Sequence, residues 1–199
     1  MNRIFQPYLR KFIAIFFDDI LIYSRTWADH LENLKTTLAV LRTHDLYAKA
    51  SKCSFGQNQV DYLGHVVCSM GIKVDPSKIE AIQAWPKPTS LKQLRGFLGL
   101  TGYYRKFVLG YAQLAHPLTE LLKKNCFHWG AEADMTFDKL KTAMTHTPVL
   151  SLPNFSQRFT VETDTSNTGI GAVLSQNKHL LAYFSKKLNP KLAMSSAYI

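Results

Sequence analysis

The fold is organised around eight residues, Phe16-Phe17-Asp18-Asp19-Ile20-Leu21-Ile22-Tyr23. Two adjacent carboxylates separate two apolar, β-prone runs, at 12–17 and 20–23, and each run predicts a buried strand. Aspartate at such a junction favours a tight turn. The stretch therefore predicts a hairpin that carries Asp18 and Asp19 at its tip.

Two neighbouring carboxylates at a turn have two interpretations. Like charges side by side repel one another unless a cation lies between them or water screens them. Mg²⁺ prefers carboxylate oxygen, with one or two protein ligands and the phosphates of a substrate, and two-metal phosphoryl transfer uses such ligands. The alternative is a solvated Asp-Asp turn without a function, and these eight residues alone leave both open.

The composition indicates a polyanionic partner. The chain has 199 residues, 46% of them hydrophobic, which is enough for one or two domains with cores of their own. It carries 24 Lys and Arg against 14 acidic residues, a formal net charge of +10. Such a balance favours nucleic acid first and an anionic membrane surface second.

Several classes of protein are not expected. No apolar run approaches the roughly 20 residues that span a bilayer, and the basic start of the chain is unlike a secretory signal. The seven histidines show no His-x-x-x-His pair and no Cys/His cluster, which argues against a zinc site. The three scattered cysteines are typical of free thiols in a reducing, intracellular compartment: Cys53, Cys68 and Cys126.

Helical and strand patterns follow the acidic stretch. Thr26 is expected to cap a helix, with Asp29 completing a weak capping box. Residues 60–67 predict one further strand, in which Gly64 indicates a bulge or a close backbone approach. Four leucines at helical spacing are expected to form the buried face of the helix after Thr26: Leu31, Leu34, Leu38 and Leu41.

A second informative element is the helix expected over about residues 91–108. Asp75 and Pro76 predict a short helix before it, and Ser90 with Gln93 forms a capping box at its start. One side of the helix is apolar. The opposite side holds cations and glycines within an arc of roughly 120°: Lys92, Arg95, Gly96, Gly99, Gly102 and Lys106.

This basic, glycine-rich face favours contact with a nucleic-acid duplex. Each glycine inside a helix costs about 1 kcal/mol relative to alanine, and a face without side chains lets phosphates come close to the backbone. Residues 86–124 hold seven Lys or Arg and one acid, Glu120, so the charge is local. The alternative is tight helix packing on the glycines beside solvated lysines.

The C-terminal part changes to β character. Helices are expected over 112–124 and 131–145, and strands follow over 158–164, 169–175 and 180–185. A turn at 176–178 joins the last two strands. The chain is therefore expected to be α+β, with a hairpin, then a helical region, then a β-meander.

The ordered motifs resemble the reverse transcriptase of gypsy-type LTR retrotransposons. Residues 16–19 resemble the catalytic aromatic-x-Asp-Asp hairpin of that family, and residues 62–65, Tyr-Leu-Gly-His, resemble the stretch leading into the primer grip. Residues 94–105 resemble the thumb helix that follows the template-primer duplex. Residues 162–166 and 169–174 resemble the opening of RNase H.

The resemblance implies three parts: the C-terminal part of the palm over 1–74, the thumb and connection over 75–155, and the N-terminal part of an RNase H-like domain over 156–199. It implies RNA-directed DNA synthesis with two Mg²⁺ ions in the complete protein, Mn²⁺ being a possible substitute. The partners would be an RNA/DNA template-primer duplex and a dNTP. The protein would be located in the cytoplasm, within a virus-like particle, or in the nucleus. The implied catalytic and metal-binding residues are Asp18, Asp19 and Asp164.

The chain also departs from the family pattern. The polymerase site of the family needs a third carboxylate from an upstream strand, but residues 1–17 contain no acid. The RNase H site needs acids after Asp164, but residues 165–199 contain none. An alternative function is therefore that of a catalytically inactive, non-specific nucleic-acid-binding remnant of a decayed element.

Overall fold

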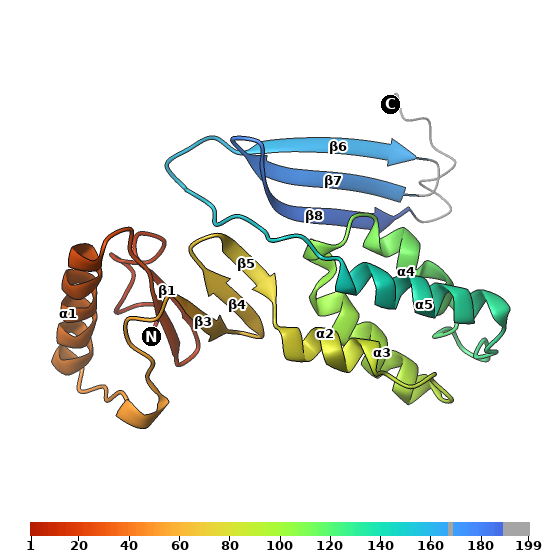
Figure 1. Cartoon of the computed structure of the whole chain (residues 1–199), viewed down its shortest axis with the longest axis horizontal. Helices are drawn as coiled ribbons and strands as arrows, with labels where there is room; N and C mark the ends of the chain where they lie inside the picture. Colours follow the sequence, from red (N-terminus) through yellow and green to blue (C-terminus); the bar gives the residue numbers. More distant parts are fainter. Residues whose placement is uncertain (167–168, 189–199) are drawn as a thin grey trace. The chain divides into compact units, whose positions relative to one another are not determined.

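The computed structural model describes residues 1–166 and 169–188 and divides into two compact units, Met1–Leu63 and Gly64–Ile199 (Figure 1). Both helices and strands are present in each unit, so the predicted α+β class is confirmed. Among the described residues, no helix is long and apolar enough to cross a membrane.

The first unit contains the predicted acidic hairpin. Strands β1 (Ile13–Phe16) and β2 (Asp19–Ile22) pair antiparallel, with Phe16 opposite Asp19. The unit also holds the helix α1 (Trp27–Thr43), a 3₁₀ turn (Ala50–Lys52) and the strand β3 (Gln59–Tyr62). Its small core is formed by Phe5, Ile13 and Leu41 with half-buried neighbours. The flanking runs are mostly half-buried, less covered than the prediction of buried strands.

The expected leucine core face of α1 is wrong at two of its four positions. Leu31 and Leu38 are 47% and 45% exposed, whereas Leu41 is buried. A helix of 17 residues is about 25 Å long, but each strand of the adjacent hairpin has four residues and spans only about 13 Å. The hairpin is therefore too short to cover the whole stripe.

The single strand expected over 60–67 is also wrong. The chain forms β3 up to Tyr62 and then a new strand, β4 (His65–Cys68). Leu63 and Gly64 between them have φ values of 50° and 71°. Two successive residues with positive φ form a tight reversal of the kind found in two-residue hairpins, with glycine at the second position. Gly64 thus marks a turn instead of a bulge, and the close backbone approach that was the alternative is present, because Tyr104 Oη lies 2.8 Å from Gly64 O.

The second unit is built on a helical core. After the hairpin of β4 and β5 (Gly71–Val74) come the helices and 3₁₀ turn in this order: α2 (Pro76–Gln83), α3 (Leu91–Tyr103), η2 (Arg105–Phe107), α4 (Tyr111–Glu120) and α5 (Ala131–Thr145). The side chain of Asp75 caps α2, and Ser90 Oγ accepts from Gln93 N at 3.3 Å to cap α3, as predicted. Ile82, Leu94, Phe97, Leu118 and Leu140 are among the fully buried side chains.

The predicted β-meander forms the rest of this unit. Strands β6 (Thr160–Ser166), β7 (Gly169–Gln176) and β8 (His179–Lys187) pair antiparallel in that order (Figure 1). Asn177 and Lys178, both with positive φ, form the two-residue turn. β8 packs against α4, where Ala112 N donates to Ser185 Oγ at 2.8 Å.

The segment before the meander joins two sheets. Ile72 N donates to Leu150 O at 2.7 Å, and Leu150 N donates back to Ile72 O at 2.9 Å. The next residue, Ser151, donates its N–H to Leu180 O at 2.7 Å. This short segment therefore links β5 to β8 through backbone hydrogen bonds.

Gln176 at the end of β7 holds the loop before β6. Its side chain is buried; Oε1 accepts from Asn154 N at 2.8 Å, and Nε2 donates to Asn154 O at 2.8 Å. Further carbonyls, of Gln157 and Arg158, lie 3.2 and 3.3 Å from Nε2. The amide thus satisfies several backbone groups of the loop at once.

We expect Gln176→Leu to lower the free energy of unfolding by about 2 to 3 kcal/mol, because buried backbone groups would lose their partners. Urea unfolding followed by circular dichroism measures this change. The matched control is Gln83→Leu on the exposed end of α2, which should change stability by no more than about 0.5 kcal/mol. Equal effects of the two substitutions would contradict the role of Gln176.

Candidate functional site

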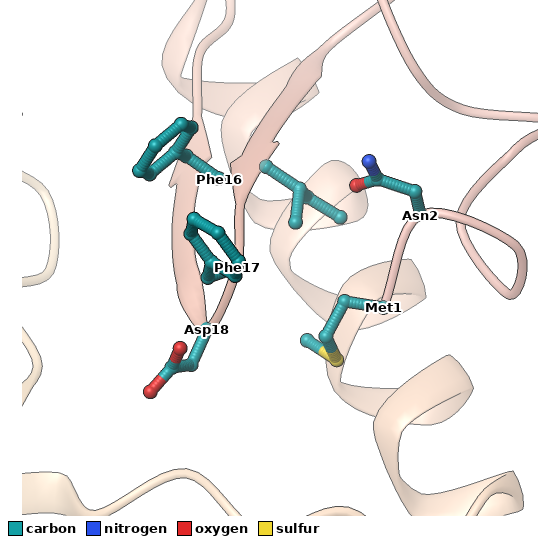
Figure 2. Close-up of a pocket in the computed structure, with 6 residues that line it drawn as sticks. Met1, Asn2, Phe16, Phe17 and Asp18 are labelled. Atoms are coloured by element: carbon teal, nitrogen blue, oxygen red, sulfur yellow. The ribbon is translucent and has the colours of Figure 1, made fainter.

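The acidic hairpin ends in a two-residue turn formed by Phe17 and Asp18 (Figure 2). Phe17 has a φ of 52°, in the left-handed region, which costs a bulky residue roughly 1 to 3 kcal/mol. Such strained residues cluster at functional sites. Asp18 and Asp19 are both exposed, so the turn presents two adjacent carboxylates to solvent.

The aromatic side chains of the turn are exposed as well. The rings of Phe16 and Phe17 meet edge to face with centroids 4.8 Å apart, and the two residues are 51% and 77% exposed. They border a hollow of about 510 Å³ that is also lined by Met1, Asn2, Ile15 and Asp18 (Figure 2).

A metal ion at this tip would have only two protein carboxylates. Across residues 1–166 and 169–188, no group of three or more His, Cys, Asp or Glu side chains is arranged to hold a metal. The oxygen donors of Asp18 and Asp19 suit Mg²⁺, which accepts one or two carboxylates together with water and phosphate. They suit one such ion but are too few to hold two ions close together.

The acidic tip also affects the pKa of Tyr62 on β3. Burial raises the pKa of its phenol, and the negative charge of Asp19 raises it further. The neutral hydroxyl is therefore favoured beside the acid. The sequence pattern gave no reason to connect these two residues.

Asp164 lies on β6 of the second unit. Its side chain is exposed, and Gly171 is the residue opposite it on β7, so no neighbouring side chain covers it from that strand. All seven residues of β6 are exposed. Glu162, two residues earlier on the same strand, is the acid beside it, and within the described part of the chain the two belong to no group of three or more side chains that could hold a metal ion.

The basic face of α3 is largely as expected. Leu94, Phe97 and Thr101 are buried on one side of the helix. On the other side, four of the predicted residues are exposed and Gly102 is half-buried: Lys92, Arg95, Gly96 and Gly99 are the exposed four. This helix therefore offers two cations beside bare backbone.

The expected helix over 91–108 is wrong at its end, and Lys106 leaves the predicted face. α3 ends at Tyr103, and Lys106 lies in η2. The chain turns here because Tyr104 is buried and its hydroxyl donates to Gly64 O at 2.8 Å. Lys106 is half-buried with Nζ 5.4 Å from the centroid of Phe107, and burial lowers the pKa of its amine.

The three glycines of α3 differ in their surroundings. A Cβ atom at Gly96 would lie 3.3 Å from the ring of Trp85, and one at Gly102 would lie 3.5 Å from the hydroxyl of Tyr111. The approach at Gly96 is tight, so packing accounts for that glycine, whereas the distance at Gly102 is an ordinary van der Waals contact that a methyl group could make. A Cβ at Gly99 would meet nothing within 4 Å, so no packing within the described chain explains that glycine.

Tyr103 is a further surface residue that the sequence interpretation did not select. It is 53% exposed and follows Gly99 by four residues, which puts it on the same side of the helix. The sequence signal for Tyr103 was its spacing. Arg95, Gly99 and Tyr103 are four residues apart, and residues four apart lie on the same side of a helix. An exposed ring beside bare backbone and a guanidinium group can pack against a sugar or a base.

Residues 1–67 match the reverse transcriptase (RNA-dependent DNA polymerase) family, and residues 129–198 match the RNase H-like domain found in reverse transcriptase. An uncharacterized mitochondrial protein of Arabidopsis thaliana is 47% identical over 131 residues, which cover 65% of this chain and 83% of that protein. The Pol polyprotein of transposon 297 from Drosophila melanogaster is 41% identical over 191 residues. The chain belongs to the reverse transcriptase and RNase H region of transposon Pol polyproteins.

This reverse transcriptase segment is short beside its Pol relatives. The similarity to the transposon 297 polyprotein covers 95% of this chain but 18% of that protein. The Tf2-3 polyprotein of Schizosaccharomyces pombe is 32% identical over 195 residues, which cover 95% of this chain and 15% of that protein. The chain thus spans less than a fifth of either polyprotein.

Solved structures show the same fold. A foamy viral protease-reverse transcriptase in complex with double-stranded DNA superposes with a TM-score of 0.86 at 20% identity, covering 97% of this chain and 35% of that one. The foamy viral enzyme in complex with an RNA/DNA hybrid gives a TM-score of 0.85 at 20% identity, covering 97% and 27% of the two chains. This likeness confirms the expected fold of the reverse transcriptase segment.

Proposed function

We propose that this chain is part of the Pol polyprotein of a gypsy-type LTR retrotransposon. It would contribute the late palm over 1–74, the thumb and connection over 75–155, and the opening of RNase H from residue 156. The complete protein would synthesise DNA on an RNA template and degrade the RNA of the hybrid. The observation that carries the proposal is the β1–β2 hairpin, whose strained turn exposes Asp18 and Asp19 side by side.

The two carboxylates would hold Mg²⁺, with Mn²⁺ as a substitute. A bound divalent ion would polarise phosphoryl oxygens of an incoming dNTP as a Lewis acid. Asp18 occupies the turn itself, with no residue opposite it in the strand register, and is the better placed of the two to receive an ion. The aromatic pair beside it, Phe16 and Phe17, would exclude water from one side of the site.

The exposed side of α3 would bind the RNA/DNA template-primer duplex. Lys92 and Arg95 supply charge for phosphates, and Gly99 leaves room for close approach because no side chain of the described chain fills that space. Tyr103 would add a ring contact at the end of the same side. Asp164 would be the first acid of the RNase H site in the complete protein.

Salt dependence tests the duplex contact. We expect Lys92→Gln with Arg95→Gln to lower the slope of log K against log salt by about 2 for a short RNA–DNA hybrid, since each lost phosphate contact contributes about 0.9. Fluorescence anisotropy at several salt concentrations gives the slope. The matched control replaces two exposed lysines outside α3, Lys124 and Lys139, with glutamine.

The two double variants carry the same net charge. If both lowered the slope equally, binding would reflect overall charge and the assignment to α3 would fail. A retained wild-type slope in Lys92→Gln/Arg95→Gln would place the contact elsewhere.

The second candidate function is nucleic-acid binding without catalysis, as expected of a remnant of a decayed element. It is favoured by the acids of the described chain, which form no group of three. Binding together with absent primer extension is common to both proposals for the isolated chain. Primer extension by a longer polymerase that contains this segment separates the two proposals, because only the first of them predicts it. In either case we propose an intracellular location, in the cytoplasm, in a virus-like particle or in the nucleus.

A further inference from the structure

The imidazole of His65 is buried with one of its two ring nitrogens lacking a hydrogen-bond partner among the described residues. The residue begins β4 and is 9% exposed, and its Nδ1 has no hydrogen-bond partner among the described residues. A buried polar atom without a partner is costly, so its presence in a fold needs a reason. A hydrophobic side chain of similar size would avoid that cost.

Three aromatic rings surround this imidazole. Tyr103 stacks on it with centroids 5.4 Å apart and an interplanar angle of 28°. Tyr104 and Phe107 meet it edge to face at 5.4 and 5.6 Å. These separations are the ones at which ring pairs attract beyond simple burial. We call these four residues the His65 box.

The box joins the β4–β5 hairpin to the end of α3. His65 belongs to the hairpin, whereas Tyr103 ends α3, Tyr104 joins α3 to η2, and Phe107 ends η2. The residue before His65 is held as well, because Tyr104 Oη donates to Gly64 O at 2.8 Å. A Cβ atom at Gly64 would lie 3.0 Å from that hydroxyl. His65 and the turn residue before it are therefore both held by the same helix end.

Burial, together with a nearby positive charge, keeps the imidazole neutral. Burial lowers the pKa of His65 to about 4, and the positive charge of Lys106 contributes in the same direction. Burial and then the charges of Tyr103 and Asp75 raise the pKa of Tyr104 to about 12, so its hydroxyl stays protonated. At neutral pH the stack on Tyr103 is thus formed by an uncharged ring.

We propose that His65 is a positioning residue for nucleic-acid binding: through its stack it fixes the orientation of Tyr103 on the exposed side of α3. The inner side of the Tyr103 ring rests on His65, while the residue as a whole is 53% exposed. His65 itself does not touch the duplex. The proposal rests on the proposed function of α3, and it adds that the β4–β5 hairpin and the duplex-binding side of α3 act as one body.

Two substitutions of similar size separate stacking from simple filling of space. His65→Leu keeps the site apolar and filled but removes the ring, so we expect the affinity for a short RNA–DNA hybrid to fall about threefold to tenfold. His65→Phe retains a ring and should keep the affinity within about twofold. Neither substitution removes a phosphate contact, so the salt slope should be that of the wild-type chain.

The same binding titration with Arg95→Gln distinguishes a failure of the His65 proposal from a failure of the proposed function of α3. Weaker binding in Arg95→Gln together with wild-type binding in folded His65→Leu would overturn the role of His65 alone. Wild-type binding in Arg95→Gln would overturn the proposed function of α3. Equal losses in His65→Leu and His65→Phe would also overturn the inference, because the ring would then be irrelevant.

Unfolding as a function of pH keeps the inference testable if a variant is unstable. The unfolded chain takes up a proton on His65 below about pH 6.5, whereas the folded chain does so only near pH 4. The wild-type chain should therefore lose stability relative to His65→Phe as the pH falls from about 6.5 to 4. A constant difference between the two chains would mean that the imidazole is not held neutral in the box.

Discussion

The purified 199-residue chain is expected to show neither RNA-templated primer extension nor cleavage of an RNA–DNA hybrid above background, in Mg²⁺ or in Mn²⁺. Two-metal catalysis requires carboxylates that hold two ions about 4 Å apart and orient the attacking oxygen. The described part of the chain offers Asp18 and Asp19 in one unit and Asp164 in the other. Positioning alone can be worth several kcal/mol of barrier, and each 1.36 kcal/mol is tenfold in rate.

Gel-based extension of a labelled DNA primer on RNA, and cleavage of a labelled hybrid, measure both activities. A complete retroviral-type enzyme serves as the positive control, and anisotropy on the same samples shows that the hybrid is bound. Template-dependent extension that disappears in Asp18→Asn would contradict the expectation. It would mean that copies of the chain assemble a working site together.

Gly71→Ala should destabilise the second unit by about 3 kcal/mol. Gly71 has a φ of 134°, which side chains rarely adopt, and a Cβ atom there would lie 2.1 Å from Leu150 O. The substitution would push away the segment that hydrogen-bonds to Ile72 and Leu180 and so links two sheets. Strain of this kind and lost backbone hydrogen bonds each cost roughly 1 to 3 kcal/mol.

Gly99→Ala is the matched control for this substitution. It places the same methyl group on an open helix position, where nothing lies within 4 Å, and should stabilise the chain by up to about 1 kcal/mol. The two substitutions are therefore expected to change the free energy of unfolding in opposite directions. Urea unfolding of both variants measures these changes. A neutral Gly71→Ala would show that the linking segment does not depend on its close backbone contact.

Local signals in the sequence predicted the start of each helix well. The Thr26 side chain accepts from Asp29 N at 3.1 Å, and Ser90 caps α3 in the same way, because a capping box is defined by residues only three apart. The acidic hairpin was predicted for a similar reason. Its two apolar runs and the aspartates between them are contiguous in the sequence.

Features that depend on distant residues were not predictable. α3 ends early because Tyr104 packs against His65 and Gly64, about 40 residues before it in the chain, and this removes Lys106 from the basic face. The leucine stripe of α1 has helical spacing, but its burial depends on how much surface lies opposite. The alternation in β6 likewise predicted a strand without predicting that both of its faces are exposed.

The sequence likewise predicted some properties of the proposed binding residues and not others. Helical spacing was sufficient to bring Lys92, Arg95 and Gly99 to one exposed side. It could not separate the open glycine from Gly96, which packs on Trp85, or show that Tyr103 stacks on a buried histidine. Those distinctions depend on tertiary contacts that no local pattern encodes.

Primer extension by a chimera tests the central claim, that the Asp18–Asp19 hairpin is a polymerase site, most directly. In this chimera the 199-residue chain replaces the matching segment of the transposon 297 Pol polyprotein, to which it is 41% identical. We predict RNA-templated extension that falls on the order of a thousandfold in Asp18→Asn or Asp19→Asn, about 4 kcal/mol of barrier. Asp45→Asn, another exposed acid of the same unit, should leave the rate unchanged. A folded chimera without activity, or one whose activity survives Asp18→Asn, would contradict the account.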